Sequence, residues 1–213
     1  MKIATIAAVV ALFAAGTASA SPVNLITNGN FETVASGYTF DSGFKVIDSG
    51  SSALTGWTVG ASSVDLIRNG YNAINGYSID MLGTPGPGFL SQSFSVVAGQ
   101  TYKLSFDMAR NSGGPAGQGV AVSFGGVAGN FYSTAAASNT LYSNTLSFTA
   151  ATTGLATLSF ASAAKAGTPF DNFSGAVIDN VSVMTAVPEP ETYAMLLAGL
   201  GLMGFLRRRK AAK

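Results

Sequence analysis

Apolar and polar residues alternate along the middle of the chain, and this period of two limits the possible folds more than any other feature. The clearest run is Tyr102 to Met108, in which every second side chain is apolar. Successive side chains of a strand point to opposite faces of a sheet, so the run predicts a strand with one buried face. Further strands are predicted at Trp57–Val59, Val64–Ile67, Tyr77–Leu82, Leu90–Val96, Val120–Phe124, Thr145–Phe148, Leu155–Phe160 and Val177–Val183.

Turn-forming residues separate these segments, including Asn28-Gly29, Asn69-Gly70 and Asn75-Gly76. Asparagine and glycine adopt the backbone angles that tight turns require. Many short strands with regular turns are typical of an all-β sandwich. We therefore expect one β-sandwich domain over residues 21–186.

Both ends of the chain are expected to be targeting segments. Lys2 precedes an apolar run from Ile3 to Ala15, and Ala18-Ser19-Ala20 follows. This order is typical of a secretory signal peptide, with the small residues Ala18 and Ala20 marking the signal-peptidase site. Residues 1–20 are therefore predicted to be removed after Ala20.

Residues 187–213 contain a proline-rich motif, an apolar run over 193–206 and a basic end over 207–213. A helix over 193–206 would be about 21 Å long, short of the roughly 30 Å hydrocarbon core. The basic end would stay on the cytoplasmic side while the domain lies outside. The segment is therefore expected to anchor the protein only transiently. Its defining residues are Pro188, Glu189, Pro190, Arg207, Arg208 and Arg209.

These three parts, in this order, resemble the PEP-CTERM sorting signal of Gram-negative bacteria that make extracellular polysaccharide. The resemblance implies recognition by an exosortase and cleavage near Pro188-Glu189-Pro190. The protein would then pass from the inner membrane to the cell surface or the extracellular matrix.

The composition of the predicted domain weighs against two classes of protein. From Ser21 to Val187 there are five Lys and Arg and eight Asp and Glu residues, a formal charge of −3. A mildly acidic domain without a basic stripe is a poor nucleic-acid partner. The chain also has no His and no Cys, which removes the commonest general base and the thiol nucleophile. We therefore expect that the protein is not an enzyme.

Three phrases carry a closer resemblance: Asn24 to Glu32, Leu54 to Val59 and Ala176 to Val183. Together they resemble the choice-of-anchor C proteins. The opening and closing phrases also resemble carbohydrate-binding modules of the galactose-binding-like type. The resemblance implies a jelly-roll β-sandwich, while the family name describes anchoring and no activity.

Glu32 lies just after an expected first strand and Asp179 at the start of the last, near the two ends of the predicted domain. We expect Asp179 on the core-facing side with Val181 and Val183, where a carboxylate must be paired, protonated or bound to a cation. In the resembled jelly rolls the two chain ends lie side by side and often hold a structural calcium ion. Glu32 and Asp179 are therefore candidate calcium ligands. Alternatively, they cap turns or accept backbone N–H bonds.

Aromatic residues are candidates for glycan contact, although the sequence does not select a site. Trp57, the only tryptophan, is expected in the core, with stacking on a sugar as the alternative. Asp65 and Asp80 are interpreted as turn and strand-edge residues. Aromatic residues expected in loops or near strand edges are Tyr38, Phe40, Tyr71, Tyr132 and Tyr142.

The sequence favours an exported structural or adhesive protein of the cell surface or exopolysaccharide matrix, without catalysis. A second hypothesis is a carbohydrate-binding module with a defined glycan site. A polysaccharide hydrolase is a third, weakened by the missing acid–base residues. The expected partners are signal peptidase, exosortase and exopolysaccharide, and structural calcium is the one cofactor expected.

Overall fold

The computed structural model describes residues 23–36, 40, 43–134, 139–171, 173–186 and 198–201. The predicted signal-peptidase residues Ala18 and Ala20, the Pro188 to Pro190 motif and the Arg207 to Arg209 cluster lie outside the described residues. Within the described ranges, no helix has the length and apolar character needed to cross a membrane.

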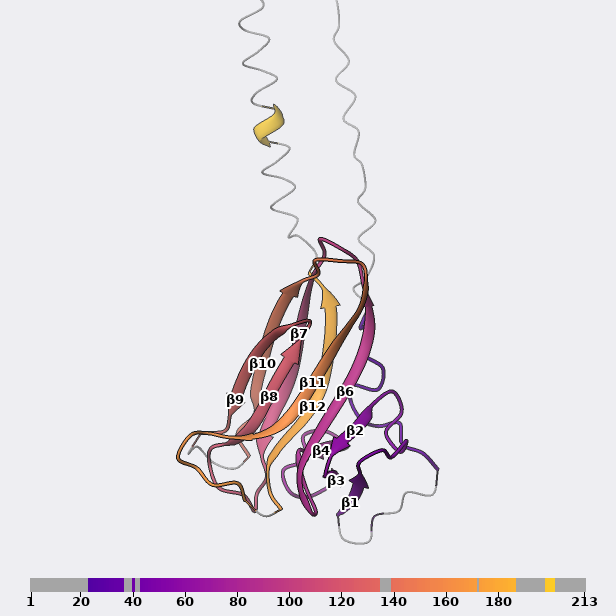
Figure 1. Ribbon diagram of the computed structural model, residues 1–213. Helices are drawn as coiled ribbons and strands as arrows, with labels where there is room; N and C mark the ends of the chain where they lie inside the picture. Colours follow the sequence, from indigo (N-terminus) through magenta and orange to yellow (C-terminus); the bar gives the residue numbers. More distant parts are fainter. Residues whose placement is uncertain are drawn as a thin grey trace, which may run out of the picture.

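The described chain forms twelve antiparallel strands arranged in two main sheets (Figure 1). The first sheet has the order β1-β3-β4-β12-β7-β10 and the second the order β2-β6-β11-β8-β9, with β5 paired to β6. This is the expected jelly-roll β-sandwich. Its strands are β1 (Phe44–Asp48), β2 (Thr58–Ala61), β3 (Ser63–Arg68), β4 (Tyr77–Asp80), β5 (Leu82–Gly83), β6 (Gly86–Val96), β7 (Thr101–Arg110), β8 (Gln118–Phe124), β9 (Val127–Tyr132), β10 (Tyr142–Thr149), β11 (Gly154–Ala164) and β12 (Ala176–Thr185).

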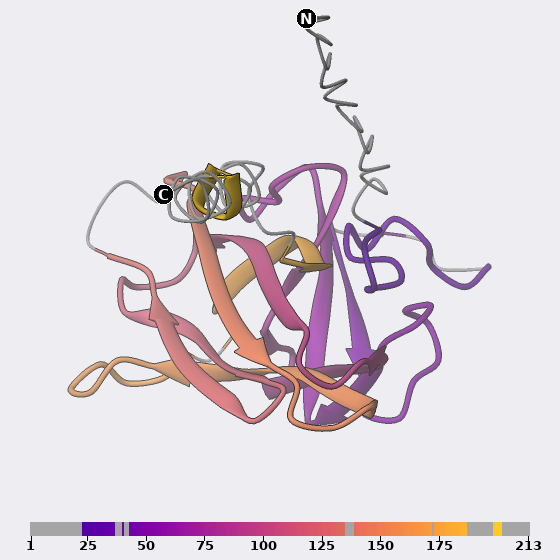
Figure 2. The ribbon, with the colours of Figure 1, turned by 90° about the horizontal axis from the view of Figure 1, so that it is seen from above.

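The alternating apolar residues fill the space between the two sheets, which the view from above shows as separate layers (Figure 2). Phe106 of β7 packs edge-to-face on Phe160 of β11 with ring centroids 5.1 Å apart, so the contact joins the two sheets. Both rings are fully buried. Apolar burial of this kind is the main source of stability in a chain without disulfides.

Strands β1 and β9 were not predicted by the alternation. Both lie at a sheet edge, and β9 is exposed or half-buried along its whole length. An edge strand covered on neither face need not alternate. The segment before Glu32, which we expected to be a strand, instead forms turns.

The two ends of the domain lie side by side, as expected. The Leu25 N–H donates to the Val183 carbonyl at 2.8 Å, and the Val181 N–H donates to the Gly29 carbonyl at 2.9 Å. A Cβ atom on Gly29 would lie 1.9 Å from the Val181 oxygen, so only glycine permits this approach. The contact holds the opening turns, and with them Glu32, beside β12.

The outer face of the first sheet carries a second, smaller apolar cluster. It is formed by Ile67 of β3, Ala109 of β7 and Val177 of β12, packed with Phe44. Their neighbours along the strands, such as Leu66 and Ile178, belong to the main core. The small cluster therefore lies on the side of the sheet that faces away from the sandwich interior.

Candidate functional site

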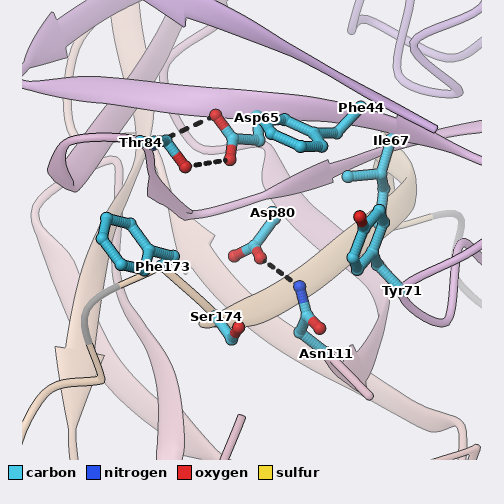
Figure 3. Close-up of a pocket in the computed structure, with 9 residues that line it drawn as sticks. All are labelled: Phe44, Asp65, Ile67, Tyr71, Asp80, Thr84, Asn111, Phe173 and Ser174. Atoms are coloured by element: carbon cyan, nitrogen blue, oxygen red, sulfur yellow. Dashed lines mark hydrogen bonds between the residues drawn. The ribbon is translucent and has the colours of Figure 1, made fainter. Parts of the chain in front are cut away.

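A pocket of about 340 Å³ opens beside this outer cluster, at the end of the molecule where the short strands β1 to β4 gather (Figure 1). Ligand pockets for small molecules are typically a few hundred Å³, largely apolar, with a few polar groups. Nine residues line it, drawn in Figure 3: Phe44, Asp65, Ile67, Tyr71, Asp80, Thr84, Asn111, Phe173 and Ser174.

Three aromatic rings form much of the apolar wall. Phe173 lies on one side of the Asp80 carboxylate and Tyr71 on the other (Figure 3). Tyr71 is 37% exposed and Phe173 is 55% exposed, so both rings can be reached from solvent. Phe44 meets Tyr71 edge-on with centroids 5.8 Å apart. Exposed rings around a cavity are suited to stacking against a ligand.

The turn that carries Tyr71 has an unusual backbone. Asn69, Tyr71 and Asn72 have φ angles of 55°, 55° and 61°. Asparagine tolerates this left-handed region, but tyrosine seldom adopts it. Strained residues of this kind are often found where a side chain must be held in place for a ligand. Here the turn brings the Tyr71 ring against Phe44.

Asp65 and Asp80 face each other across β3 and β4, where they are direct register partners. Asp65 is 4% exposed and Asp80 is 1% exposed. Both strands are interior strands of the first sheet, so the interpretation of these residues as turn and strand-edge positions is wrong. Like charges directly opposite each other destabilise a sheet, so the pair is expected to lower the stability of the fold. A pair kept despite this cost is a candidate for a functional role.

Neutral donors hold both carboxylates. Asp65 accepts the Thr84 N–H at 3.1 Å and the Thr84 hydroxyl at 2.9 Å. Asp80 Oδ1 accepts the N–H groups of Leu82 and Gly175, both at 2.9 Å. Asp80 Oδ2 accepts the Asn111 amide at 2.6 Å. The donors come from segments far apart in the chain and fix the carboxylates at the base of the pocket.

Burial raises the pKa of Asp80 to about 7, against the hydrogen bonds from Leu82, Asn111 and Gly175, which lower it. Burial also raises the pKa of Asp65, with a smaller contribution from the charge of Asp48. The charge of Asp65 adds to the rise at Asp80. Perturbed carboxyl groups in a cleft mark a candidate functional site.

The predicted calcium ligands lie elsewhere on the same face. Glu32 is exposed and accepts the Tyr77 N–H at 2.6 Å. Asp179 is fully buried, accepting the Asn180 N–H at 2.6 Å and the Ser78 hydroxyl at 3.1 Å. Burial raises the pKa of Asp179 to about 6, and the charge of Glu32 raises it further. The two carboxylates are therefore close enough to repel each other.

The position of Asp179 differs from the expected one. The pairing of β12 with β7 shifts register between Asp179 and Ser182, and Asn180 has a φ angle of 52°. This bulge places Ile178 and Val181 on the same core-facing side. Asp179, next to Ile178, therefore faces outward, and the period-two inference was wrong.

The donor chemistry at Glu32 and Asp179 suits calcium, which binds carboxylate oxygens. Among the described residues, however, no group of three or more His, Cys, Asp or Glu side chains is placed to hold a metal ion. Further ligands would have to be carbonyl, hydroxyl or water oxygens. The structure also shows the alternative role, because both carboxylates accept backbone N–H bonds.

Trp57 belongs to the core, as expected. It is 4% exposed, its ring lies against Phe31 and Phe160, and its indole N–H donates to the Asn28 carbonyl at 3.0 Å. Of the other aromatic candidates, Tyr71 lines the pocket. Phe40 stacks on Tyr77, and Tyr142 hydrogen-bonds Thr134. Tyr132 is half-buried in β9, and Tyr38 lies outside the described residues.

Sequence reasoning missed the pocket residues Phe44, Thr84, Asn111, Phe173 and Ser174. Four of the five lie in loops, where no period marks which way a side chain points. The one usable signal was an aspartate on each of two neighbouring predicted strands, Asp65 and Asp80. Their pairing depends on the strand register, which the alternation alone does not give.

Two family models match the chain. The first, described as a protein of unknown function (DUF642), matches residues 24–184. The second, described as the PEP-CTERM protein-sorting motif, matches residues 186–210. The sorting motif implies export, membrane-associated processing and an exosortase as the processing enzyme.

Halomucin of Haloquadratum walsbyi is 30% identical over 183 residues, covering 84% of this chain and 2% of Halomucin. Thus the chain spans only a small part of that relative. The module TmCBM61, solved with beta-1,4-galactotriose, has a TM-score of 0.44 at 13% identity, covering 77% of this chain and 99% of that one. A family 35 carbohydrate-binding module from Clostridium thermocellum has a TM-score of 0.39 at 18% identity, covering 61% and 92%.

Proposed function

The chain belongs to the DUF642 family of proteins of unknown function, and we propose that its domain is an exported carbohydrate-binding module whose glycan site is the outer-face pocket. The observation that carries this proposal is the combination of exposed Tyr71 and Phe173 rings with buried carboxylate and amide groups. A sugar ring presents C–H faces that stack on aromatics and hydroxyls that bond to carboxylates and amides.

The proposal extends to location and role. Glycan binding would hold the processed protein in the matrix or on the surface of a Gram-negative bacterium, as an adhesive component without catalysis. The lack of histidine and cysteine supports a binding role. Membership of the choice-of-anchor C proteins stays a prediction.

Replacing Tyr71 or Phe173 by alanine should weaken glycan binding about tenfold each, since a lost stacking contact of about 1.4 kcal/mol corresponds to that factor. Binding of the exported protein to immobilised polysaccharides and a glycan array would measure the loss. Both side chains are exposed, so the fold should be retained.

Phe170→Ala is the matched control. Phe170 is a phenylalanine of similar exposure, 49%, three residues before Phe173, and it does not line the pocket. Equal losses for Phe170→Ala and Phe173→Ala would contradict the assignment of the pocket. Absence of binding to every polysaccharide tested would contradict the proposed function itself.

We propose further that calcium binds at Glu32 and Asp179. An ion that binds only the folded state raises stability by mass action, by about 2.7 kcal/mol at one hundred times its dissociation constant. The thermal midpoint of the exported protein should therefore be higher in millimolar calcium than in chelator, and Glu32→Gln should reduce the difference. An unchanged midpoint would rule the calcium site out.

The sorting motif leads to a prediction about mass. In the native host the mature protein should begin near Ser21 and end near Val187 to Pro190, because the apolar run and basic end are removed during processing. Deleting the exosortase, or residues Pro188 to Pro190, should leave a longer form in the inner membrane. Intact-mass measurement of the surface fraction decides this, and a species that retains Arg207 to Lys213 would show that the tail is a permanent anchor.

A further inference from the structure

Two carboxyl groups, Asp65 and Asp80, line the pocket, and none of its described lining residues is a lysine or an arginine. Neither Asp65 nor Asp80 has a described lysine or arginine among the groups that shift its pKa. The arginine of β3, Arg68, lies over the Tyr77 ring at 5.3 Å from its centroid. The arginine that ends β7, Arg110, donates to the Gly114 carbonyl at 3.1 Å. Arg68 and Arg110 therefore each interact with a group other than the two carboxylates.

The hydrogen bonds to the two carboxyl groups bring no positive charge into the pocket. Among the described residues, each hydrogen-bond donor to Asp65 and Asp80 is a backbone N–H, a hydroxyl or an amide, and all of these are neutral. An ionised carboxylate has about four acceptor positions. The two groups together therefore keep free acceptor positions beside a cavity large enough for a sugar unit, and burial penalises their charged forms with no described cation to offset the penalty.

The aromatic wall of the pocket also favours a positively charged ligand. The faces of Phe44, Tyr71 and Phe173 carry partial negative charge, and a cation above such a face is attracted to it. A neutral sugar could stack on these rings but would leave the carboxylate pair unbalanced. A uronic acid would bring a third carboxyl group to the pocket, and the cost of its negative charge beside Asp65 and Asp80 grows where water is excluded.

Building on the glycan-binding function proposed above, we propose that the pocket selects a saccharide with a free primary ammonium group, as in a de-N-acetylated hexosamine polymer. The ammonium group would donate its N–H bonds to Asp65 and Asp80, while the sugar ring stacks between Tyr71 and Phe173. Such charge-assisted bonds are roughly twice as strong as neutral ones.

Calorimetric titration of the exported protein can test this with three probes of equal length: glucosamine oligosaccharides, N-acetylglucosamine oligosaccharides and uronic-acid oligosaccharides. We expect the free amine to bind at least about tenfold more tightly than its acetylated form, because acetylation removes the charge. Uronic-acid oligosaccharides should bind the least. This comparison uses the unchanged protein and does not depend on any variant folding.

Two substitutions locate the source of the preference. Asp65→Asn should bring the affinities for the amine and acetylated forms close together while leaving stacking on Tyr71 and Phe173. Asp107→Asn removes a carboxylate that neither lines the pocket nor shifts the pKa of Asp65 or Asp80, and it should keep the preference, which controls for the general charge of the domain. Thermal melting of each variant confirms that it is folded.

The results separate the two proposals. Equal affinity for amine and acetylated forms, with Tyr71→Ala still weakening both, would overturn the ammonium assignment and leave the glycan site standing. A preference for uronic acids would overturn it as well. If the preference for the free amine persists in Asp65→Asn, the ammonium group binds away from the carboxylate pair, and the ammonium assignment is overturned. Failure of all three probes and of every other glycan would overturn both proposals.

Discussion

Replacing Trp57 by alanine should lower the free energy of unfolding by about 3–5 kcal/mol, the usual cost of deleting a large buried aromatic. The ring is 4% exposed and packs against Phe31 and Phe160. Its loss would leave a cavity between the opening turns and the core and would remove one of the two hydrogen bonds that the Asn28 carbonyl accepts, leaving the one from the Phe31 N–H. Urea unfolding of the unchanged protein and of Trp57→Ala measures the effect, provided that the dependence of the free energy of unfolding on urea concentration is the same for both.

Trp57→Phe should cost less, because it keeps a ring and loses mainly the hydrogen bond and part of the volume. Tyr71→Ala serves as the opposite control, since it should impair glycan binding with little effect on stability. A Trp57→Ala protein of nearly unchanged stability that no longer binds glycan would contradict the placement of Trp57 in the core.

The alternation of apolar and polar residues predicted the sandwich well, because each central strand buries one face and therefore has an apolar residue at every second position. Runs such as Tyr102 to Met108 became β7, and the adjacent closing strand β12 was predicted within two residues at each end. The same argument failed at β1 and β9, where edge position removes the need for a buried face. It also failed at Asp179, because one bulge at Asn180 reverses the side on which later residues lie.

The pocket could not be predicted in the same way, because its parts are brought together by strand order and loops. Asp65 and Asp80 are adjacent only because β3 and β4 pair in one particular register. Thr84, Asn111 and Phe173 then approach from three separate connections. A polar residue on an outward-facing strand position looks like an ordinary solvent-exposed residue until these loops cover it.

The buried carboxyl groups should make the domain less stable as the pH rises through neutrality. The pKa of Asp80 rises to about 7 and that of Asp179 to about 6 in the folded protein, mainly through burial, from 3.8 as the ordinary value. Between these values the folded state holds protons that the unfolded state has already released. Unfolding then releases protons, so raising the pH favours unfolding.

These groups therefore stabilise the fold fully below about pH 4, and their contribution is lost as the pH passes through about 6 and 7. A shift from 3.8 to about 7 corresponds to on the order of 4 kcal/mol for Asp80. The chain has no histidine or cysteine, so the groups that usually titrate in this interval are missing. Thermal midpoints measured in chelator should thus fall between about pH 5 and about pH 8.

Asp80→Asn should flatten this dependence, because asparagine has no proton to release, even if the amide nitrogen that replaces Oδ2 cannot accept from Asn111 and stability falls at every pH. The slope against pH is therefore the diagnostic quantity. Asp48→Asn removes an exposed carboxylate whose charge acts on Asp65 but not on Asp80 or Asp179, so it should keep most of the slope of the unchanged protein. If the midpoint instead rises from about pH 5 to about pH 8, the folded state holds Asp80 ionised, and a cation or a network of donors stronger than the one at Leu82, Gly175 and Asn111 must hold its charge.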